Sequence, residues 1–558
     1  MKKLISVLLV AVMCFSLVFP VFADSRKNAT VGIDVPVIYI SGDSIPIEYD
    51  NGQKTFEIDD FLDLFSSDDG DSSNTLEATV NILKPLIIEG ILFDEWDNYY
   101  DAMYKELSDA TKPILLDGNG NSDGTSGITA QQKKKMDYSR THDMAKKNED
   151  GLYWSHDYEF FYDWRLDPLE SVDDLHSFIQ DIKAVTGKDK VCIIAKCLGC
   201  NVLLSYIYKY GTDDLKGVGI DVATSMGADF LSGMLSGDFG IDGNSIGRFA
   251  QSVAYASDNY TELADFGAAV FSMLDDTGVL DGMSDKLREN FYSKIEYGII
   301  SAIARATFLT FPGYWGMITC EKFDDALRYV YGEEGSDLRE EYAGLIEKAS
   351  FFNENLKKNV LSIFGSLSEN NVNVAVISKY GIQMVPVLKD GSLIGDEYVS
   401  VTHSSLGAVT SDVYGTLSDE YIAERKALGL GKYISPDKKI DASTCLFPDS
   451  TWFFKGVQHG FSSSAECDIM MKVMGADRQL TVDDFELGRF VVYHQKQGIA
   501  ENMTEENCNI YWTADYTEDN PKTETEKKFS LIKNAIGLLK SFILLIVHYA
   551  TQWFNKTA

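Results

Sequence analysis

The stretch Val191-Cys-Ile-Ile-Ala-Lys-Cys-Leu-Gly-Cys-Asn201 decides the fold of this chain. Its first half is a run of apolar, partly β-branched residues, which predicts a buried strand. A helical pattern of apolar residues follows at once over residues 198–210, so the strand must turn into a helix at Cys197. So sharp a turn needs small neighbours, and Ala195 and Gly199 stand on the two sides of Cys197. The sequence therefore predicts a strand–turn–helix elbow with Cys197 at its tip.

The segments around this elbow continue the alternation of strands and helices. A strand pattern at 158–162 and a helix pattern at 171–186 lead into the elbow strand through short connections. Further strand patterns stand at 35–42, 372–378 and 451–455. Strands that alternate with helices in this way predict an α/β fold with a mostly parallel, doubly wound sheet.

A long helical segment interrupts the strand patterns. Residues 222–370 have helical periodicity, for example over 323–363, and the strand pattern fades there. We expect this segment to be a helical cap inserted at the carboxyl ends of the strands, where the active sites of such sheets lie. Its aromatic residues, including Tyr314 and Trp315, are expected to pack as core rather than to line an acyl pocket.

Three further motifs carry a resemblance to a known family. They are Tyr162-Asp-Trp-Arg-Leu-Asp-Pro168, Gly395-Asp-Glu-Tyr-Val399 and Trp452-Phe-Phe-Lys-Gly-Val-Gln-His459. Together with the elbow, they resemble the lecithin:cholesterol acyltransferase and lipase branch of the α/β-hydrolase superfamily. The resemblance implies an α/β-hydrolase fold, with Asp396 as the acid and His459 as the base of a catalytic triad. This chain departs from the family at two positions, with Cys197 in place of the nucleophilic serine and Glu397 in place of a glycine.

The resemblance and the elbow together imply acyl transfer through a Cys197, Asp396 and His459 triad, in the chain order usual for this fold. The start of the following helix is expected to favour the Cys197 thiolate. Oxyanion donors are expected at the backbone of Leu198 and in the loop after the first strand. The donors predicted in that loop are Asp43 and Ser44.

The expected substrate is a small-molecule or lipid ester, or a thioester, and the reaction needs no metal and no organic cofactor. The order of residues does not distinguish hydrolysis from transfer to an alcohol.

The alternation of Asp117, Asn119, Asn121 and Asp123 is similar to that of calcium ligands, but the required glycine and final glutamate are missing, so we expect a plain loop.

Other interpretations of the same residues stay open. His403 is an alternative base, although it would place acid and base on one loop, whereas triad residues of this fold come from successive strands. Cys197 and Cys200 form a C-x-x-C pair at a helix start, which also suits a thiol-disulfide oxidoreductase. A third possibility is a non-catalytic binding protein that keeps the fold and has lost the activity.

Composition and the two terminal segments bear on location and partners. The 85 acidic and 50 basic residues give a formal net charge of −35, which disfavours nucleic-acid binding. Residues 1–23 have the pattern of a cleaved signal peptide, so we expect a secreted or cell-surface protein. An apolar stretch near residue 545 suggests peripheral membrane contact. The expected organisation is a signal peptide at 1–23, the first part of the core at 24–221, the cap at 222–370, the second part of the core at 371–515, and a linker with an apolar C-terminal helix at 516–558.

The cysteine count bears on redox state. Of eight cysteines, Cys14 lies in the predicted signal peptide, which leaves seven. An odd number in an exported protein predicts at least one free thiol.

Overall fold

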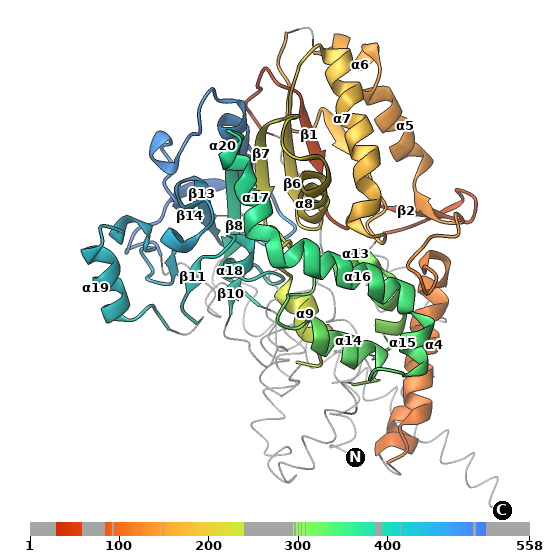
Figure 1. Ribbon diagram of the computed structural model, residues 1–558. Coiled ribbons are helices and arrows are strands. Elements are labelled where there is room, and N and C mark those ends of the chain that lie inside the picture. The colour runs from red at the N-terminus through yellow and green to blue at the C-terminus, as the bar shows by residue number, and fades with distance from the viewer. Residues whose placement is uncertain are drawn as a thin grey trace, which may run out of the picture.

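A single large sheet organises the chain (Figure 1). The computed structural model describes residues 29–57, 84–91, 94–148, 150–238, 294, 297–298, 301–302, 304–306, 308–384, 393–412, 415–494 and 498–508. Within these ranges the large sheet has eight strands in the order β15-β14-β13-β8-β7-β6-β1-β5. They are β1 (Val37–Ile40), β5 (Tyr158–Phe160), β6 (Val191–Lys196), β7 (Leu215–Asp221), β8 (Asn373–Tyr380), β13 (Thr451–Lys455), β14 (Phe490–His494) and β15 (Ile499–Asn502).

All neighbouring strands of this sheet run parallel except β14 and β15, which are antiparallel. Every residue of β6, β8 and β13 is buried, as expected for parallel strands that are covered on both faces. The predicted mostly parallel α/β sheet is therefore confirmed, and the strand predicted at 451–455 has those same bounds.

Helices flank the sheet where small residues let them approach. The flanking helices are α7 (Val172–Thr186), α8 (Gly199–Tyr210), α17 (Val360–Glu369) and α20 (Ser464–Gly475). A Cβ atom at Gly217 would lie 2.5 Å from the Cα atom of Met474, and one at Gly219 would lie 2.8 Å from the sulfur of Met470. The two glycines of β7 are thus what allows α20 to lie directly on the strand.

The described part of the segment 222–370 consists of helices and connecting turns. Apart from α17, its helices lie below the sheet in Figure 1, and α17 packs on α8 and β8. The predicted aromatic cluster is buried, with both Tyr314 and Trp315 almost fully enclosed, which confirms the expectation that it packs as core. The other helices here are α9 (Asp229–Leu235), η4 (Phe308–Thr310), α13 (Pro312–Trp315), α14 (Phe323–Tyr331), α15 (Asp337–Glu341), α16 (Ala343–Asn355) and η5 (Lys357–Asn359).

Smaller elements surround this framework. Within the described ranges, the other α-helices are α4 (Asp97–Thr111), α5 (Ala130–Ser139), α6 (His142–Lys147), α18 (Val401–Ser404) and α19 (Asp419–Ala427). The short sheets described there are formed by β2 (Ile47–Tyr49), β3 (Lys54–Phe56) and β4 (Gly127–Ile128), by β9 (Ile382–Gln383) and β10 (Ile394–Gly395), and by β11 (Val409–Thr410) and β12 (Ile440–Asp441). The described residues also include a π-helix, η1 (Pro85–Ile91), and short 3₁₀ turns: η2 (Lys112–Ile114), η3 (Pro168–Ser171), η6 (Gly431–Tyr433), η7 (Ala442–Thr444), η8 (Pro448–Ser450) and η9 (Val482–Asp484).

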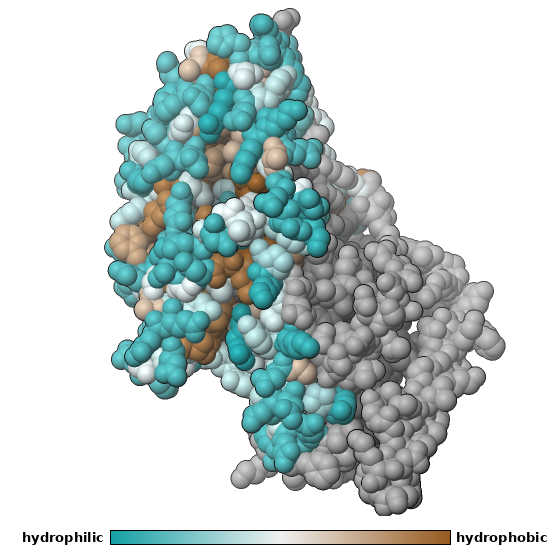
Figure 2. All heavy atoms as spheres, turned by 90° about the vertical axis from the view of Figure 1, so that its right-hand side faces the viewer, coloured by the Kyte–Doolittle hydropathy of each residue, from teal (hydrophilic) through white to brown (hydrophobic). Residues whose placement is uncertain are grey.

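The predicted terminal segments cannot be compared with the structure. The signal peptide at 1–23 and the linker and apolar helix at 516–558 both lie outside the described residues. In the ranges given above, we find no helix with both the length and the apolar character that crossing a membrane requires. On the face shown in Figure 2, hydrophilic residues cover most of the described surface, with smaller hydrophobic areas between them.

Candidate active site

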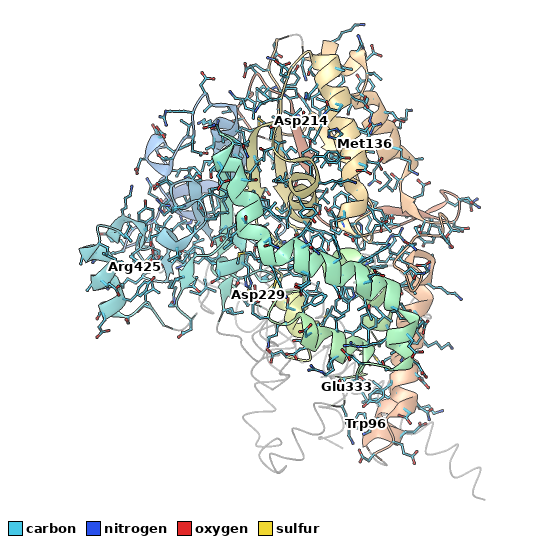
Figure 3. The ribbon with its side chains drawn as sticks, in the orientation of Figure 1. Trp96, Met136, Asp214, Asp229, Glu333 and Arg425 are labelled. Carbon is cyan, nitrogen blue, oxygen red and sulfur yellow. The ribbon has the colours of Figure 1, made fainter. Side chains whose placement is uncertain are left out.

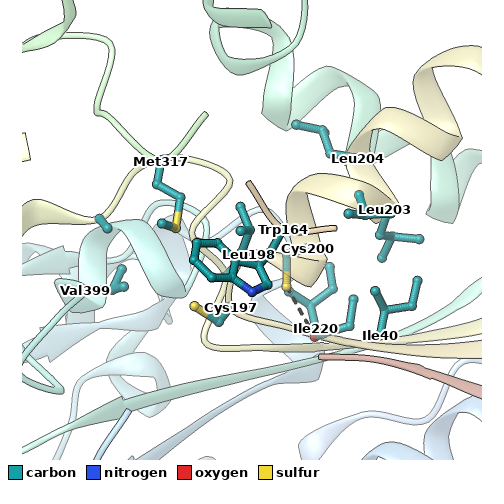
Figure 4. Packing of buried hydrophobic residues seen from close by; sticks show 14 of the residues in the cluster. Ile40, Trp164, Cys197, Leu198, Cys200, Leu203, Leu204, Ile220, Met317 and Val399 are labelled. Carbon is teal, nitrogen blue, oxygen red and sulfur yellow. Dashed lines mark hydrogen bonds between the residues drawn. The ribbon is translucent and has the colours of Figure 1, made fainter. Parts of the chain in front are cut away.

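The predicted elbow is present between β6 and α8 (Figure 4). Cys197 has a φ of 51°, which a residue with a side chain rarely adopts and which marks a strained turn. Its backbone N–H donates to the carbonyl oxygen of Asp221 at 3.0 Å. A Cβ atom at Gly199 would lie 2.4 Å from the carbonyl oxygen of Ile40, so only glycine fits there. The small-residue pattern in the sequence therefore has a direct steric cause.

The loop after β1 lies against the Cys197 side chain. A Cβ atom at Gly42 would lie 3.0 Å from the Cβ atom of Cys197, 3.3 Å from its sulfur and 3.7 Å from the backbone nitrogen of Leu198. The two loop residues predicted to supply oxyanion donors, Asp43 and Ser44, come directly after this contact. The loop and the start of α8 thus lie side by side at the sulfur.

The motif at 162–168 holds this loop in place. The Tyr162 hydroxyl donates to the carbonyl oxygen of Ser41 at 2.9 Å, and the Trp164 indole N–H donates to that of Ile45 at 2.8 Å. The two aromatic side chains therefore fix both sides of the turn that carries Gly42. In the same motif, Arg165 Nη2 and Asp163 Oδ2 form an ion pair at 2.6 Å.

The predicted acid and base lie together. Asp396 follows β10, and His459 lies in the loop between β13 and α20. His459 Nδ1 and Asp396 Oδ2 are 2.9 Å apart, and both side chains are buried. The second oxygen of Asp396 accepts the backbone N–H groups of Tyr398 at 3.2 Å and Val399 at 2.9 Å. The carboxylate is thus held so that one oxygen faces the imidazole, which orients the ring.

Tyr398 connects the acid–base pair to the elbow. Its ring centroid lies 5.2 Å from that of His459. Burial raises the pKa of the Tyr398 hydroxyl well above 10, and the charges of Asp43, Cys197 and Asp396 raise it further. Groups that influence one hydroxyl lie near it, so the structure brings the three predicted triad residues and Asp43 into one region. Nothing in the sequence pattern singled out Tyr398 except its position within the Gly395–Val399 motif.

The electrostatic environment disfavours a resting thiolate. Burial raises the pKa of the Cys197 thiol well above 9, the nearby Asp43 carboxyl adds to the shift, and the Leu198 N–H opposes it only in part. The Leu198 N–H at the helix start does favour the thiolate, as expected, but desolvation of the sulfur outweighs this one N–H group and the pKa is raised. A neutral thiol needs a base to remove its proton at the moment of attack.

Asp43 is a second buried carboxyl at this site. Burial raises its pKa, although a hydrogen bond from Tyr314 and the proximity of His459 lower it in part. The Tyr314 hydroxyl donates to Asp43 Oδ2 at 3.1 Å. Sequence reasoning favoured core packing for Tyr314 over a place at an acyl pocket, and it did not predict the bond to Asp43, because a contact 271 positions away leaves no local signal.

The alternative base, His403, has a different acid. Its Nδ1 lies 3.0 Å from Asp229 Oδ2, and the Ser400 N–H donates to the same oxygen at 2.6 Å. Asp229 begins α9, at the position labelled in Figure 3. His403 is thus paired with the helical segment, whereas His459 is the histidine paired with Asp396.

The cysteines of the described region are free thiols. The Cys200 sulfhydryl is fully buried and donates to the carbonyl oxygen of Ala195 at 3.2 Å. Figure 4 shows the sulfurs of Cys197 and Cys200 pointing in different directions.

Among the residues that the structure describes, no group of three or more histidine, cysteine, aspartate or glutamate side chains could hold a metal ion. In the loop with alternating Asp and Asn residues at 117–123, Asp117 Oδ1 accepts hydrogen bonds from the backbone N–H groups of Asn119 and Asn121.

No family model matches the chain, and no curated protein is similar enough to match it.

Proposed function

We propose that this chain is a secreted α/β-hydrolase-fold enzyme, similar to the lecithin:cholesterol acyltransferase and lipase branch, with a helical cap. In this proposal Cys197 is the nucleophile, His459 the base and Asp396 the residue that orients it. The substrate is a small-molecule or lipid ester, or a thioester, and the products are an acid or a new ester.

The hydrogen bond between His459 and Asp396 is the observation that carries the proposal. It joins residues 63 positions apart at 2.9 Å, with both side chains buried. The loops that follow β6 and β13 leave the sheet at one edge, because these strands are parallel, so elbow and base start from the same edge. The chain order Cys197, Asp396, His459 is that of nucleophile, acid and base in α/β hydrolases.

The first half of the reaction forms an acyl-enzyme. His459 accepts the proton of the Cys197 thiol while the sulfur attacks the carbonyl carbon of the ester. The carbonyl π electrons move to the oxygen, where the Leu198 N–H and the backbone of the Asp43 and Ser44 loop stabilise the negative charge. The C–O bond to the alcohol then breaks, and His459 gives its proton to the leaving oxygen.

The second half releases the acyl group. His459 removes a proton from water or from an acceptor alcohol, whose oxygen attacks the thioester carbon. The carbon–sulfur bond breaks, and the proton returns to the Cys197 sulfur. Asp396 keeps one imidazole nitrogen protonated and stabilises the imidazolium that forms in each half.

Mass spectrometry of the intact, reduced protein tests this proposal. The protein is exposed briefly to a p-nitrophenyl ester, with acetate, butyrate and longer acyl chains tried in turn. An acyl adduct on Cys197 that is absent in Cys197→Ala and in His459→Ala supports the proposal. Adduct formation that persists in Cys197→Ala would overturn the assignment of the nucleophile.

A non-catalytic binding protein is the second candidate, and the enclosure of Cys197 favours it. The residue is only 6% exposed, and burial raises the pKa of its thiol. A protein with free Cys197 that forms no adduct at any chain length would support this alternative. A thiol-disulfide oxidoreductase is the third, and it predicts that disulfide reduction is lost in Cys200→Ala as well as in Cys197→Ala.

A further inference from the structure

Four charged side chains are buried beneath the loop that carries His459. Lys196, Asp221 and Lys379 stand at or next to the last residues of the adjacent strands β6, β7 and β8, and Glu466 lies in the first turn of α20. Each of them is at most 5% exposed. Two ammonium groups and two carboxylates make the cluster neutral, which is the condition for holding charges away from water.

The two lysines point their ammonium groups at the backbone that follows His459. Lys196 Nζ donates to the carbonyl oxygen of Gly460 at 2.6 Å and to the Ser462 hydroxyl at 3.0 Å. Lys379 Nζ donates to the carbonyl oxygen of Phe461 at 2.6 Å. Three consecutive residues after the predicted base are therefore held by two buried cations.

The carboxylates complete the attachment. Lys379 Nζ lies 3.1 Å from Asp221 Oδ1 and 3.5 Å from Glu466 Oε1. The Ser462 hydroxyl donates to Asp221 Oδ2 at 3.1 Å, and the Ser463 N–H donates to Glu466. Burial alone would lower the pKa of Lys379, but Asp221 and Glu466 outweigh that effect and raise it above 10.5. Lys379 therefore stays charged, and its hydrogen bond to the loop persists over the whole neutral range.

The same cluster reaches the nucleophile. Lys196 directly precedes Cys197, and the carbonyl oxygen of Asp221 accepts the Cys197 N–H at 3.0 Å. Asp221 thus binds the elbow through its backbone and the base loop through its side chain. A shift of this residue would change the separation between nucleophile and base.

We propose that Lys196, Asp221, Lys379 and Glu466 are positioning residues that set His459 relative to Cys197. This inference rests on the proposed acyl transfer. Breaking a buried charge cluster is usually strongly destabilising, whereas apolar replacement of the whole cluster can be neutral, so stability alone does not require these charges. The hydrogen bonds to residues 460, 461 and 462 supply the reason for them, because proton transfer from sulfur to imidazole depends on distance.

The test compares two buried lysines. Lys196→Met removes the ammonium bound to the base loop. Lys455→Met is the matched control, because Lys455 is also 5% exposed and binds Asp437 at 2.9 Å and the carbonyl oxygen of Cys508 at 2.7 Å, all outside residues 460–463. Ser462→Ala removes one link without changing charge. Each variant is measured for its melting temperature, its single-turnover acylation rate with p-nitrophenyl butyrate, and the ester concentration that gives half the maximal rate.

We expect Lys196→Met to acylate about 10²-fold more slowly than the wild type at an unchanged half-saturating ester concentration, as for a misplaced catalytic group. Ser462→Ala should show a smaller decrease, and Lys455→Met should keep the wild-type rate at temperatures where it is folded. The inference would be overturned if Lys196→Met and Lys455→Met both lost stability and both acylated at the wild-type rate. That outcome would leave the proposed function standing. A wild-type protein that forms no acyl adduct would instead overturn the proposed function, and the inference with it.

Discussion

Two histidine–aspartate pairs of nearly equal length stand in this molecule. The His459 and Asp396 pair is 2.9 Å long, and the His403 and Asp229 pair is 3.0 Å long. The first joins two loops at the sheet, one of them directly after β13, and its side chains are at most 3% exposed. The second joins α18 to α9, and its side chains are 17% and 9% exposed.

The position of a histidine–aspartate pair in the fold, and not the length of its hydrogen bond, indicates its role. His459 contacts the Tyr398 ring and the Asp396 carboxylate, and Asp43, Cys197 and Asp396 all act on the pKa of the Tyr398 hydroxyl. The pKa of His403 is instead affected by the charges of Asp229, Glu321 and Lys357, which belong to the helical segment. We therefore interpret the second pair as a structural attachment of α9 to α18, the helix that follows the loop containing Asp396.

The largest expected difference between the pairs is in acyl transfer. We expect His459→Ala to lower the single-turnover acylation rate about 10⁴-fold, since removal of a triad base has effects of this size. His403→Ala should stay within about threefold of the wild type, because it contacts no reacting group. The measurement is p-nitrophenol release under single-turnover conditions. Loss of activity in His403→Ala alone, in folded protein, would exchange the roles of the two histidines.

The acids should differ in the same direction. Asp396→Asn keeps the shape of the side chain but favours the wrong imidazole tautomer, so we expect about a 10³-fold lower acylation rate. Asp229→Asn is the matched variant in the second pair, and it should lower the melting temperature while leaving the rate nearly unchanged. Equal rates for the two variants would contradict the assignment of Asp396.

A third prediction concerns the residue beside the first acid. Glu397 has a φ of 86°, a backbone conformation that favours glycine, and burial followed by the nearby Asp396 raises the pKa of its carboxyl. We expect Glu397→Gly to raise the free energy of unfolding by about 1 kcal/mol, because it relieves the strained backbone and removes a buried carboxyl. Glu397→Ala, measured beside it in urea, removes the carboxyl but keeps the strain and should be less stable than Glu397→Gly. The opposite order would show that the strained backbone is not the cause.

The smallest expected effect is the pH dependence of the second pair. Burial would lower the pKa of His403, but Asp229 outweighs it and raises the pKa above 6.5, while the pKa of Asp229 is lowered from 3.8. The stabilisation from protonated His403 is therefore complete below pH 6.5 and is lost as the pH rises through the raised pKa of His403. The stabilisation from the Asp229 carboxylate is lost only when the pH falls below 3.8.

The difference in melting temperature between the wild type and His403→Gln measures this effect. We expect a difference of about 1–2 °C at a pH near 5.5, and a smaller one at a pH near 9. A difference that grows with rising pH would contradict the ion pair. A control with His494→Gln, whose partner Glu501 is half-exposed, should change the melting temperature little at both pH values, because an exposed ion pair stabilises weakly.

Features that depend on residues close together in the chain could be predicted from the local sequence. The elbow was predictable because small residues stand two positions on either side of Cys197, and at Gly199 the structure shows the steric demand directly. The strand over 451–455 was predictable from a short apolar run with turn residues around it. The pairing of His459 with Asp396 followed from motifs and their order, although nothing local measures the 2.9 Å between them.

Contacts between distant residues could not be predicted in this way. The attachment of Tyr162 to the loop at Ser41 spans 121 positions, and that of Lys196 to Gly460 spans 264. The helix start lowers the pKa of the Cys197 thiol as expected, but the larger and opposite effect of burial could not be predicted, because the exclusion of water from a sulfur is a property of the packed interior.

The parallel α/β sheet and the elbow could be predicted from the sequence, because periodicity and small residues are local properties of the chain, and the three residues of the proposed triad followed from the elbow and from the resemblance of two motifs to a known family. Only the packed structure showed that His403 meets Asp229, which lysines lie under the base loop and how strongly burial acts on the Cys197 thiol. These depend on packing between segments far apart in the chain, and charges in such an interior are set by burial and by partners that no local pattern names.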